Sequence, residues 1–201
     1  MPGNEKKLKE LAEQCVKDAE KSLGKQPKSC KAFFEEFLWL HADISSDGKI
    51  WNEDWKEYTD IGHMPCTWRS KMIKKALKYL FPDTKFSVRC DQYSLGNSID
   101  ISWEDGPPSK VLRNTGVTWQ FEKVYRDELT GEILSGGNAF VFDRRRYSPE
   151  AREYVKRKVA ERFGIPEEEV EREPIYRQEF WKTLEATDFR SEPPRILEEI
   201  I

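Results

Sequence analysis

The sequence predicts an α+β protein: a helical N-terminal segment followed by a small antiparallel sheet, a meander of about four strands, flanked by helices. Three patterns predict this class. Apolar residues recur at helical spacing across residues 8–23. Apolar and polar residues alternate in residues 86–91 and again in 98–103, which is the period of a half-buried strand. A Ser-Pro-Glu run at 148–150 has the composition of a helix start.

The composition is that of a globular protein. Of the 201 residues, 37% are hydrophobic and 12% aromatic, which suffices for a core although the mean hydropathy is -0.80. No apolar run approaches the roughly 18 residues of a membrane span, so we expect a cytoplasmic protein without membrane contact. Because Cys15, Cys30, Cys66 and Cys90 contain no CxxC pair, we expect buried, reduced thiols.

Helical periodicity dominates the first 80 residues. The stripe from Leu8 to Leu23 predicts a first helix that Gly24 and Pro27 end, and the apolar residues 29–42 predict a second, largely buried helix. Trp51, Trp55 and Tyr58 fit a short third helix. A fourth helix is expected to begin at a Thr67 cap and to end before Pro82.

Strand patterns occupy the centre of the chain. Residues 86–91 and 98–103 should pair as an antiparallel hairpin, and residues 105–108, Asp-Gly-Pro-Pro, end the second strand. Val117, Trp119 and Phe121 alternate as in a third strand, and residues 140–144 fit a fourth.

The C-terminal part returns to helical patterns. Ser148 should cap a helix that Gly164 ends, and an acidic start at residues 167–170 precedes another helix near residues 178–185. We therefore predict three parts: a helical segment over residues 1–66, an α+β domain over 67–164 and an acidic extension over 165–201.

The loop at residues 43–54 has the spacing of a degenerate EF-hand loop. Its ligands to calcium or magnesium would be Asp43, Ser45, Asp47, the carbonyl of Lys49, and Asp54. Asp54 stands where calcium favours a bidentate Glu, so we expect weak binding at most. The alternative is a simple connection in which Asp47 and Gly48 supply a turn.

Basic residues form two clusters that suggest contact with a nucleic acid or an acidic partner. Residues 67–90 carry seven Lys or Arg against one acid, and residues 144–162 hold the second group. The predicted contact residues are Arg69, Lys71, Lys74, Lys75, Lys78, Arg144, Arg145, Arg146, Arg152, Lys156 and Arg157. The alternative is that the acidic residues 167–173 fold over the second cluster and neutralise it.

Catalytic residues are not evident, and we expect no catalytic or cofactor-binding set. A metal-dependent nuclease built from Asp83, Lys85, Asp100, Glu104 and Asp105 is the enzymatic alternative, since paired carboxylates hold magnesium in such enzymes. Charged residues at strand ends are also ordinary, so we expect a protein that acts by binding.

Three short motifs carry a resemblance to a known family: FPDTKFSVR at 81–89, SIDISWEDGP at 98–107 and RRRYSPEA at 144–151. The segment 68–164 resembles an accessory domain of the large polyvalent proteins of phages and conjugative elements. This resemblance implies a protein of a mobile element that manages host defences. Its partner would be a host defence protein or ribonucleoprotein complex in the bacterial cytoplasm.

The leading functional hypothesis is therefore a counter-defence inhibitor, anti-CRISPR or anti-restriction, that occludes a host nuclease complex. One alternative is an accessory protein that binds DNA or RNA through the clusters 69–89 and 144–162. Another is a binding module regulated by a cation at the 43–54 loop.

Overall fold

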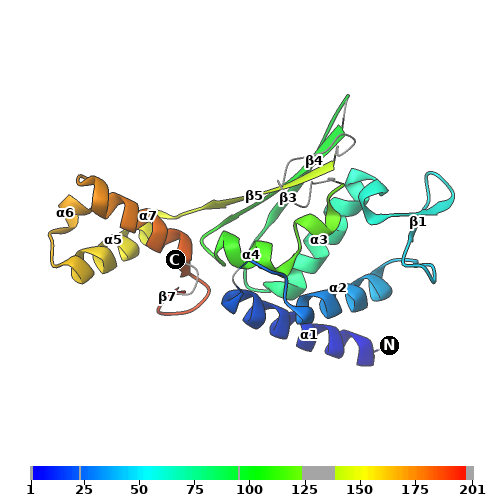
Figure 1. Ribbon diagram of the computed structural model, residues 1–201, viewed down its shortest axis with the longest axis horizontal. Coiled ribbons are helices and arrows are strands. Elements are labelled where there is room, and N and C mark those ends of the chain that lie inside the picture. The colour runs from blue at the N-terminus through cyan, green and yellow to red at the C-terminus, as the bar shows by residue number, and fades with distance from the viewer. Residues whose placement is uncertain (1, 23, 95, 124–138, 198–201) are drawn as a thin grey trace.

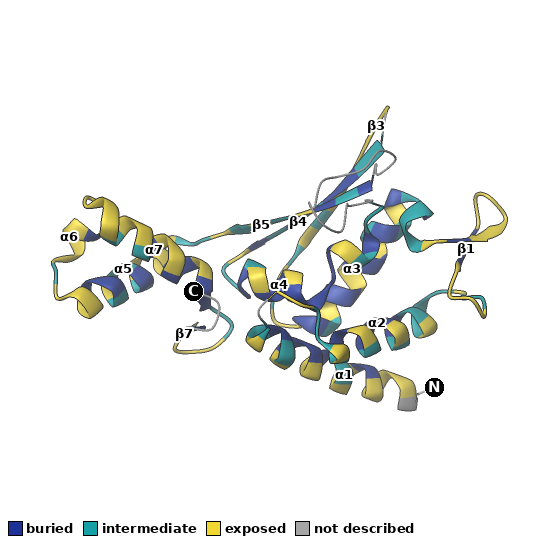
Figure 2. Cartoon of the chain, viewed as in Figure 1, coloured by how far each residue is buried: buried dark blue, intermediate teal, exposed yellow. Residues whose placement is uncertain are grey.

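The computed structural model describes residues 2–22, 24–94, 96–123 and 139–197 (Figure 1). It confirms the α+β class. Helix α1 (Pro2–Lys21) packs against α2 (Lys28–His41), and α3 (Cys66–Leu80) packs on α1. Figure 2 shows buried residues on the sides of these helices that face one another. The predicted stripe explains this, because Leu8, among its residues, is fully buried.

The segment between α2 and α3 corrects the predicted third helix. It forms a hairpin of β1 (Ile50–Asn52) and β2 (Glu57–Thr59), followed by the short 3-10 turn η1 (Ile61–His63). The side chain of Asn52 accepts hydrogen bonds from the backbone N–H groups of Asp54 and Trp55 at 3.0 and 3.3 Å. Such a local side-chain bond favours a turn over a helix.

Helix α3 begins one residue before the predicted cap. Pro65 occupies the N-cap position, and no side chain caps the helix, so the expected capping role of Thr67 is wrong. The apolar side of α3 enters the core as predicted, with Ile73, Ala76 and Leu77 buried. Proline fits here because it needs no N–H partner.

The central sheet has the order β3-β4-β5. Strands β3 (Ser87–Tyr93) and β4 (Gly96–Glu104) form the predicted antiparallel hairpin, with Val88 opposite Ile101. Strand β5 (Ala139–Arg146) pairs with β4 in parallel, with Ile101 opposite Asp143. The predicted meander of about four antiparallel strands is therefore replaced, within the described residues, by a mixed sheet of three.

The expected third strand is helical instead. Helix α4 (Ser109–Thr115) ends at Gly116, whose φ of 90° is readily adopted only by glycine, and a 3-10 turn η2 (Trp119–Phe121) follows. Val117 and Phe121 are fully buried four residues apart, whereas Trp119 is 46% exposed. One turn of helix produced the apparent alternation. A parallel β4-β5 pair requires a crossover connection, and this segment belongs to it.

Helices lie on one face of the sheet. Ile99, Ile101 and Trp103 of β4 point into the core that α3 and α4 share, and Figure 1 shows α1–α4 on that side. The opposite face carries no helix of the described chain. We call it the open sheet face. The strands direct the following residues toward it, of which Ser98 is buried: Ser87, Arg89, Asp91, Ser98, Asp100, Ser102, Phe140, Phe142, Arg144 and Arg146.

The C-terminal helices build a second hydrophobic cluster. Helices α5 (Pro149–Phe163), α6 (Glu167–Val170) and α7 (Pro174–Ala186) bury, among others, Val155 and Phe180. Ser148 caps α5 as predicted, accepting the N–H of Ala151 at 3.1 Å. Short strands β6 (Thr187–Asp188) and β7 (Arg195–Ile196) then pair. Within the described residues, no helix is long and apolar enough to span a membrane.

The cysteines correct another expectation, because they form disulfides. Cys15 pairs with Cys30 and Cys66 with Cys90, with Cα–Cα distances of 4.5 and 6.0 Å. These distances lie in the ordinary range for a disulfide. The packing of α1 on α2 and of α3 on β3 brings the partners together, which spacings of 15 and 24 residues do not reveal.

Candidate functional site

The first basic cluster forms a row on the exposed side of α3. Lys71, Lys74, Lys75 and Lys78 are all exposed, and we call this row the lysine face. Helical spacing places them together, because the apolar residues between them turn toward the core. Lys75 approaches Nδ1 of His41 at 3.2 Å, and burial, followed by the charge of Lys75, lowers the pKa of His41.

The lysine face borders a hollow at the start of β3. Lys74 and Lys78 line it together with Asp83, Lys85 and Phe86, and its volume is about 340 Å³. Three ammonium groups and one carboxylate thus line this hollow, and the excess positive charge favours an anionic occupant.

Arg69 does not belong to this surface. It is fully buried, and its guanidinium donates to the carbonyls of Met64 at 3.1 Å and Phe121 at 2.6 Å and to Oδ1 of Asn97. Burial lowers the pKa of Arg69. The predicted contact with a partner is therefore wrong at this position, because the side chain joins α3 to η2 and β4.

The run 144–146 alternates between solvent and interior, as a strand requires. Arg144 and Arg146 are exposed on the open sheet face. Arg145 points the other way and donates to the carbonyls of Asp105 at 2.6 Å, Gly106 at 2.8 Å and Thr187 at 2.6 Å. Burial lowers the pKa of Arg145, so its predicted role in partner contact is replaced by a structural one.

The remaining cations of the second cluster lie on α5. Arg152 approaches Glu171 at 3.4 Å and lies 5.2 Å from the ring of Trp181, so the acidic extension does neutralise this residue. Arg157 is exposed, and Lys156 is half-buried. Figure 1 places α5 at one end of the long axis and α3 nearer the middle, so the cations of α5 and the lysine face do not form one surface.

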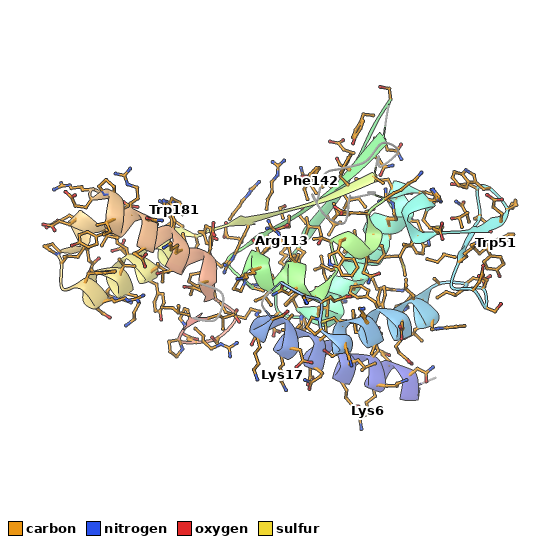
Figure 3. The ribbon with its side chains drawn as sticks, viewed as in Figure 1. Lys6, Lys17, Trp51, Arg113, Phe142 and Trp181 are labelled. Atoms are coloured by element: carbon orange, nitrogen blue, oxygen red, sulfur yellow. A yellow bond between two sulfur atoms is a disulfide. The ribbon has the colours of Figure 1, made fainter. Side chains whose placement is uncertain are left out.

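The open sheet face combines aromatic rings with ions. The rings of Phe140 and Phe142 stack at 6.0 Å, and Phe142 is 49% exposed. Arg144 approaches Asp100 on the neighbouring strand at 3.5 Å. Figure 3 shows Phe142 and Arg113 on opposite sides of β5, and Arg113 binds Asp143 at 2.7 Å on the helix side.

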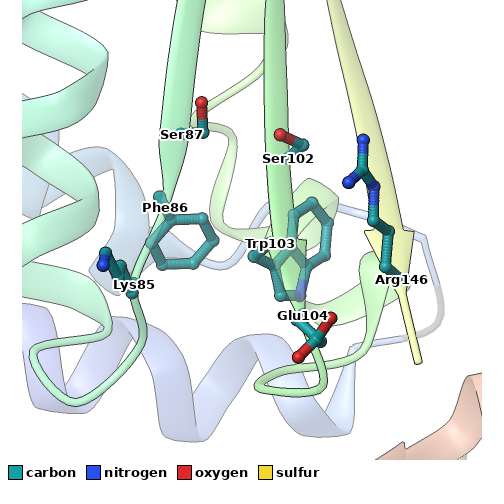
Figure 4. A pocket seen from close by; sticks show the side chains of 7 residues that line it. All are labelled: Lys85, Phe86, Ser87, Ser102, Trp103, Glu104 and Arg146. Atoms are coloured by element: carbon teal, nitrogen blue, oxygen red, sulfur yellow. The ribbon is translucent and has the colours of Figure 1, made fainter. Parts of the chain in front are cut away.

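One end of the sheet holds a hollow of about 230 Å³ (Figure 4). Lys85, Ser87, Ser102, Glu104 and Arg146 line it, together with the rings of Phe86 and Trp103. Lys85 also lines the hollow beside the lysine face, so this residue links that face to the sheet.

The acidic residues of the nuclease alternative lie near this end. Asp83, Glu104 and Asp105 line one hollow of about 470 Å³ with Lys85, whereas Asp100 lies on the open sheet face. Oδ1 of Asp105 accepts the N–H of Ser148 at 3.0 Å. Within the described ranges, no three His, Cys, Asp or Glu side chains are placed to hold a metal ion.

The 43–54 loop folds as a compact turn. The N–H of Ser45 donates to the Lys49 carbonyl at 2.9 Å, and the Ser45 hydroxyl donates to Asp47. Asp43 accepts the hydroxyl of Tyr58 at 3.1 Å, and Asp54 is exposed next to β1. Most of the predicted ligand oxygens therefore already accept hydrogen bonds, and the flanking element is a hairpin rather than the second helix of an EF-hand.

Residues 64–148 match the family described as "Large polyvalent protein associated domain 29". The match runs from the residues before α3 to the cap of α5, and it confirms the resemblance predicted for the central part of the chain. No curated protein and no solved structure gives a significant match.

Proposed function

Because residues 64–148 carry a large polyvalent protein accessory domain, associated with phages and mobile elements, we propose that the chain acts by binding in counter-defence. Its role would be that of an anti-CRISPR or anti-restriction inhibitor that occludes a host nuclease complex. The partner is a host defence protein or ribonucleoprotein complex. The proposal excludes turnover of nucleic acid by the protein itself.

The open sheet face supports this proposal more than any other surface. It places two stacked aromatic rings on its edge strand β5, with Asp100 of β4 opposite Phe142, Arg144 further along β5 and Arg89 on the far strand β3. Protein interfaces have this composition, with aromatic and arginine side chains that dominate the binding energy and a polar rim around them. No helix of the described residues covers this face, which leaves it accessible to a partner.

The test measures protection in cells and binding in solution. Phe142→Ala should lower the survival of a phage or plasmid challenged by a host restriction or CRISPR nuclease, and should weaken binding to the purified nuclease complex about tenfold or more. Ile175→Ala is the matched control, because Ile175 is 65% exposed on α7, away from the sheet.

Two results would count against the proposal. Unaltered protection and binding in Phe142→Ala would remove the open sheet face from the interaction. Cleavage of DNA or RNA by the purified protein alone would replace occlusion by catalysis.

A second candidate is binding of DNA or RNA through the lysine face. Four exposed lysines on α3, with Lys85 beyond them, could neutralise several phosphates. Reversal of Lys74, Lys75 and Lys78 to Glu should weaken binding and reduce the slope of log K against log salt by about 2 to 3.

The control for charge reversal is the triple substitution of Lys17, Lys21 and Lys25 to Glu, which changes net charge equally on exposed sites of the N-terminal region. Equal loss of binding in both triple variants would show a non-specific effect of net charge. Unchanged binding in the α3 variant would eliminate this candidate.

A further inference from the structure

A separate hollow of about 320 Å³ lies on the helix side of the sheet, where the β1-β2 hairpin meets the start of α3. Trp55, His63, Gln92, Asn97 and Lys123 contribute to its walls. It shares no lining residue with the lysine face or the open sheet face. An occupant of this hollow would therefore be independent of the function proposed above.

The start of α3 opens into this hollow. Pro65 and Cys66 line it, and no side chain caps the helix. The 15-residue helix thus directs unpaired N–H groups and the positive end of its dipole toward the hollow. The Cys66–Cys90 disulfide holds this end against β3.

Asn52 supplies a second, independent indication of a ligand. Only 1% of the residue is exposed, and it lines the same hollow. Its Oδ1 is used by the turn of the hairpin, whereas its Nδ2 has no hydrogen-bond partner. A buried donor without an acceptor is costly, so an acceptor on an occupant would relieve that cost.

Two cations add positive potential. Lys123 lines the hollow, and within the described part of the chain it makes no ion pair and no Asp or Glu contributes to the walls. Behind Asn97, the buried guanidinium of Arg69 binds only neutral oxygens, although Glu122 lies near enough to act on its charge. A Cβ on Gly62 would lie 2.9 Å from Cβ of Lys123, so η1 presses directly on this lysine and positions it.

Trp55 adds a flat apolar wall. The residue is 57% exposed, and its ring lies 6.3 Å from that of His63. Aromatic rings of this kind stack on nucleobases and so favour their binding. A volume of about 320 Å³ is at the lower end of small-molecule sites and suits one nucleotide.

We propose that this hollow binds a nucleoside phosphate, with the phosphate at the start of α3 beside Lys123 and the base against Trp55. The start of α3, Nδ2 of Asn52 and the ammonium of Lys123 offer donors and positive charge, which a phosphate and a base with ring-nitrogen acceptors complement. Such a group occurs in a free nucleotide and at the phosphorylated end of a nucleic acid strand.

The test uses the full-length protein and calorimetric titration with adenosine 5′-monophosphate, adenosine and inorganic phosphate. The monophosphate should bind at least about tenfold more tightly than either fragment. Lys123→Ala should weaken binding of the monophosphate without affecting adenosine, and Trp55→Ala should weaken both. Lys17→Ala and Trp39→Ala, at exposed sites elsewhere, should change neither.

Short single DNA strands with and without a 5′-phosphate identify the source. Tighter binding of the phosphorylated strand than of the mononucleotide assigns the hollow to strand ends, and the reverse order assigns it to free nucleotides; both support the proposal. Equal binding of adenosine and its monophosphate, or full binding by Lys123→Ala, would overturn it. Variants that lose nucleotide yet still capture the nuclease complex separate this inference from the proposed function.

Discussion

Arg145 shows at the residue scale that neighbours in one arginine run have different roles. Its guanidinium joins the end of β4 to the residues after α7 through backbone carbonyls, whereas Arg146 is exposed. A lysine lacks the planar fork that reaches several acceptors at once. Arg145→Lys should therefore lower the free energy of unfolding by about 2–4 kcal/mol.

Thermal unfolding measures this effect. Arg146→Lys is the matched control and should change the free energy of unfolding by no more than about 0.5 kcal/mol. If both variants unfolded at the same temperature, the assigned role of Arg145 would be wrong.

Asp188 predicts sensitivity to acid. Its side chain is 3% exposed and binds Arg190 at 2.6 Å. Burial opposes ionisation, but the hydrogen bonds and charge of Arg190 outweigh it and hold the pKa of Asp188 below 3.8. A depressed pKa stabilises the fold above the unfolded value, and that contribution disappears as pH falls through the folded value.

We therefore expect the free energy of unfolding to decline below about pH 4, and to decline less steeply in Asp188→Asn. Denaturant titrations at a series of pH values measure both slopes. Equal slopes in the two proteins would show that another group governs the acid transition.

At the scale of elements, the hairpin that contains the 43–54 loop decides how strongly a cation can bind. Ser45 and the Lys49 carbonyl already bond each other, and the Lys49 ammonium lies 3.6 Å from Asp47. A cation must displace these contacts, so any binding of calcium or magnesium should be weak, in about the millimolar range.

Calorimetric titration with each ion tests this prediction. Asp47→Ala should abolish the heat of binding, whereas Glu57→Ala, an exposed acid of β2, should retain it. Absence of any heat in the unaltered protein would dismiss regulation by a cation at this loop.

Elements with a strict period were predictable from the sequence. The first stripe as far as Ala19, the hairpin of Val88 and Ile101, and the cap at Ser148 occur as expected; Leu23, the last residue of the stripe, lies outside the described residues. Residues 51–58 had a helical spacing and residues 117–121 a strand spacing, yet both predictions were wrong, because three residues are too few to establish a period. In residues 51–58, the hydrogen bonds to the Asn52 side chain favour a turn. In residues 117–121, burial of Val117 and Phe121, four residues apart, favours one helical turn.

At the scale of the whole molecule, two hydrophobic clusters are connected by β5 and by an ionic clasp between the C-terminal end of α1 and residues 190–195. Glu20 of α1 binds Arg190 at 2.8 Å and Arg195 at 2.9 Å. Only 14% of the Glu20 side chain is exposed, so this pair is less screened than a surface pair.

Glu20→Gln keeps the shape of the side chain but removes its charge. We expect faster amide hydrogen exchange in residues 187–197 and a loss of about 1–3 kcal/mol in stability. Glu13→Gln, an exposed position on the same helix, is the control. Unchanged exchange in residues 187–197 would show that the clasp does not hold the C-terminal segment.

The candidate sites were only partly predictable. Exposed lysines on α3 follow from helical periodicity, and they occur as expected. The structural roles of Arg69 and Arg145 could not be predicted from the sequence. Whether an arginine is buried or exposed depends here on backbone carbonyls of distant residues that accept its hydrogen bonds. The hollow beside Trp55 is lined by residues between Asn52 and Lys123. These residues are far apart in the sequence, so no local sequence pattern predicts that they lie together.

By itself, the amino-acid order determined the α+β class, the amphipathic helices, the β3-β4 hairpin and the family resemblance of the central segment. Each of these depends on residues close together in the chain, and the spacing of apolar residues among them indicates a helix or a strand. The folded chain alone decided that β5 runs parallel to β4, that the cysteines pair, and that Arg69 and Arg145 turn inward. These outcomes depend on contacts between distant residues, whose free energies exist only once the elements have packed together.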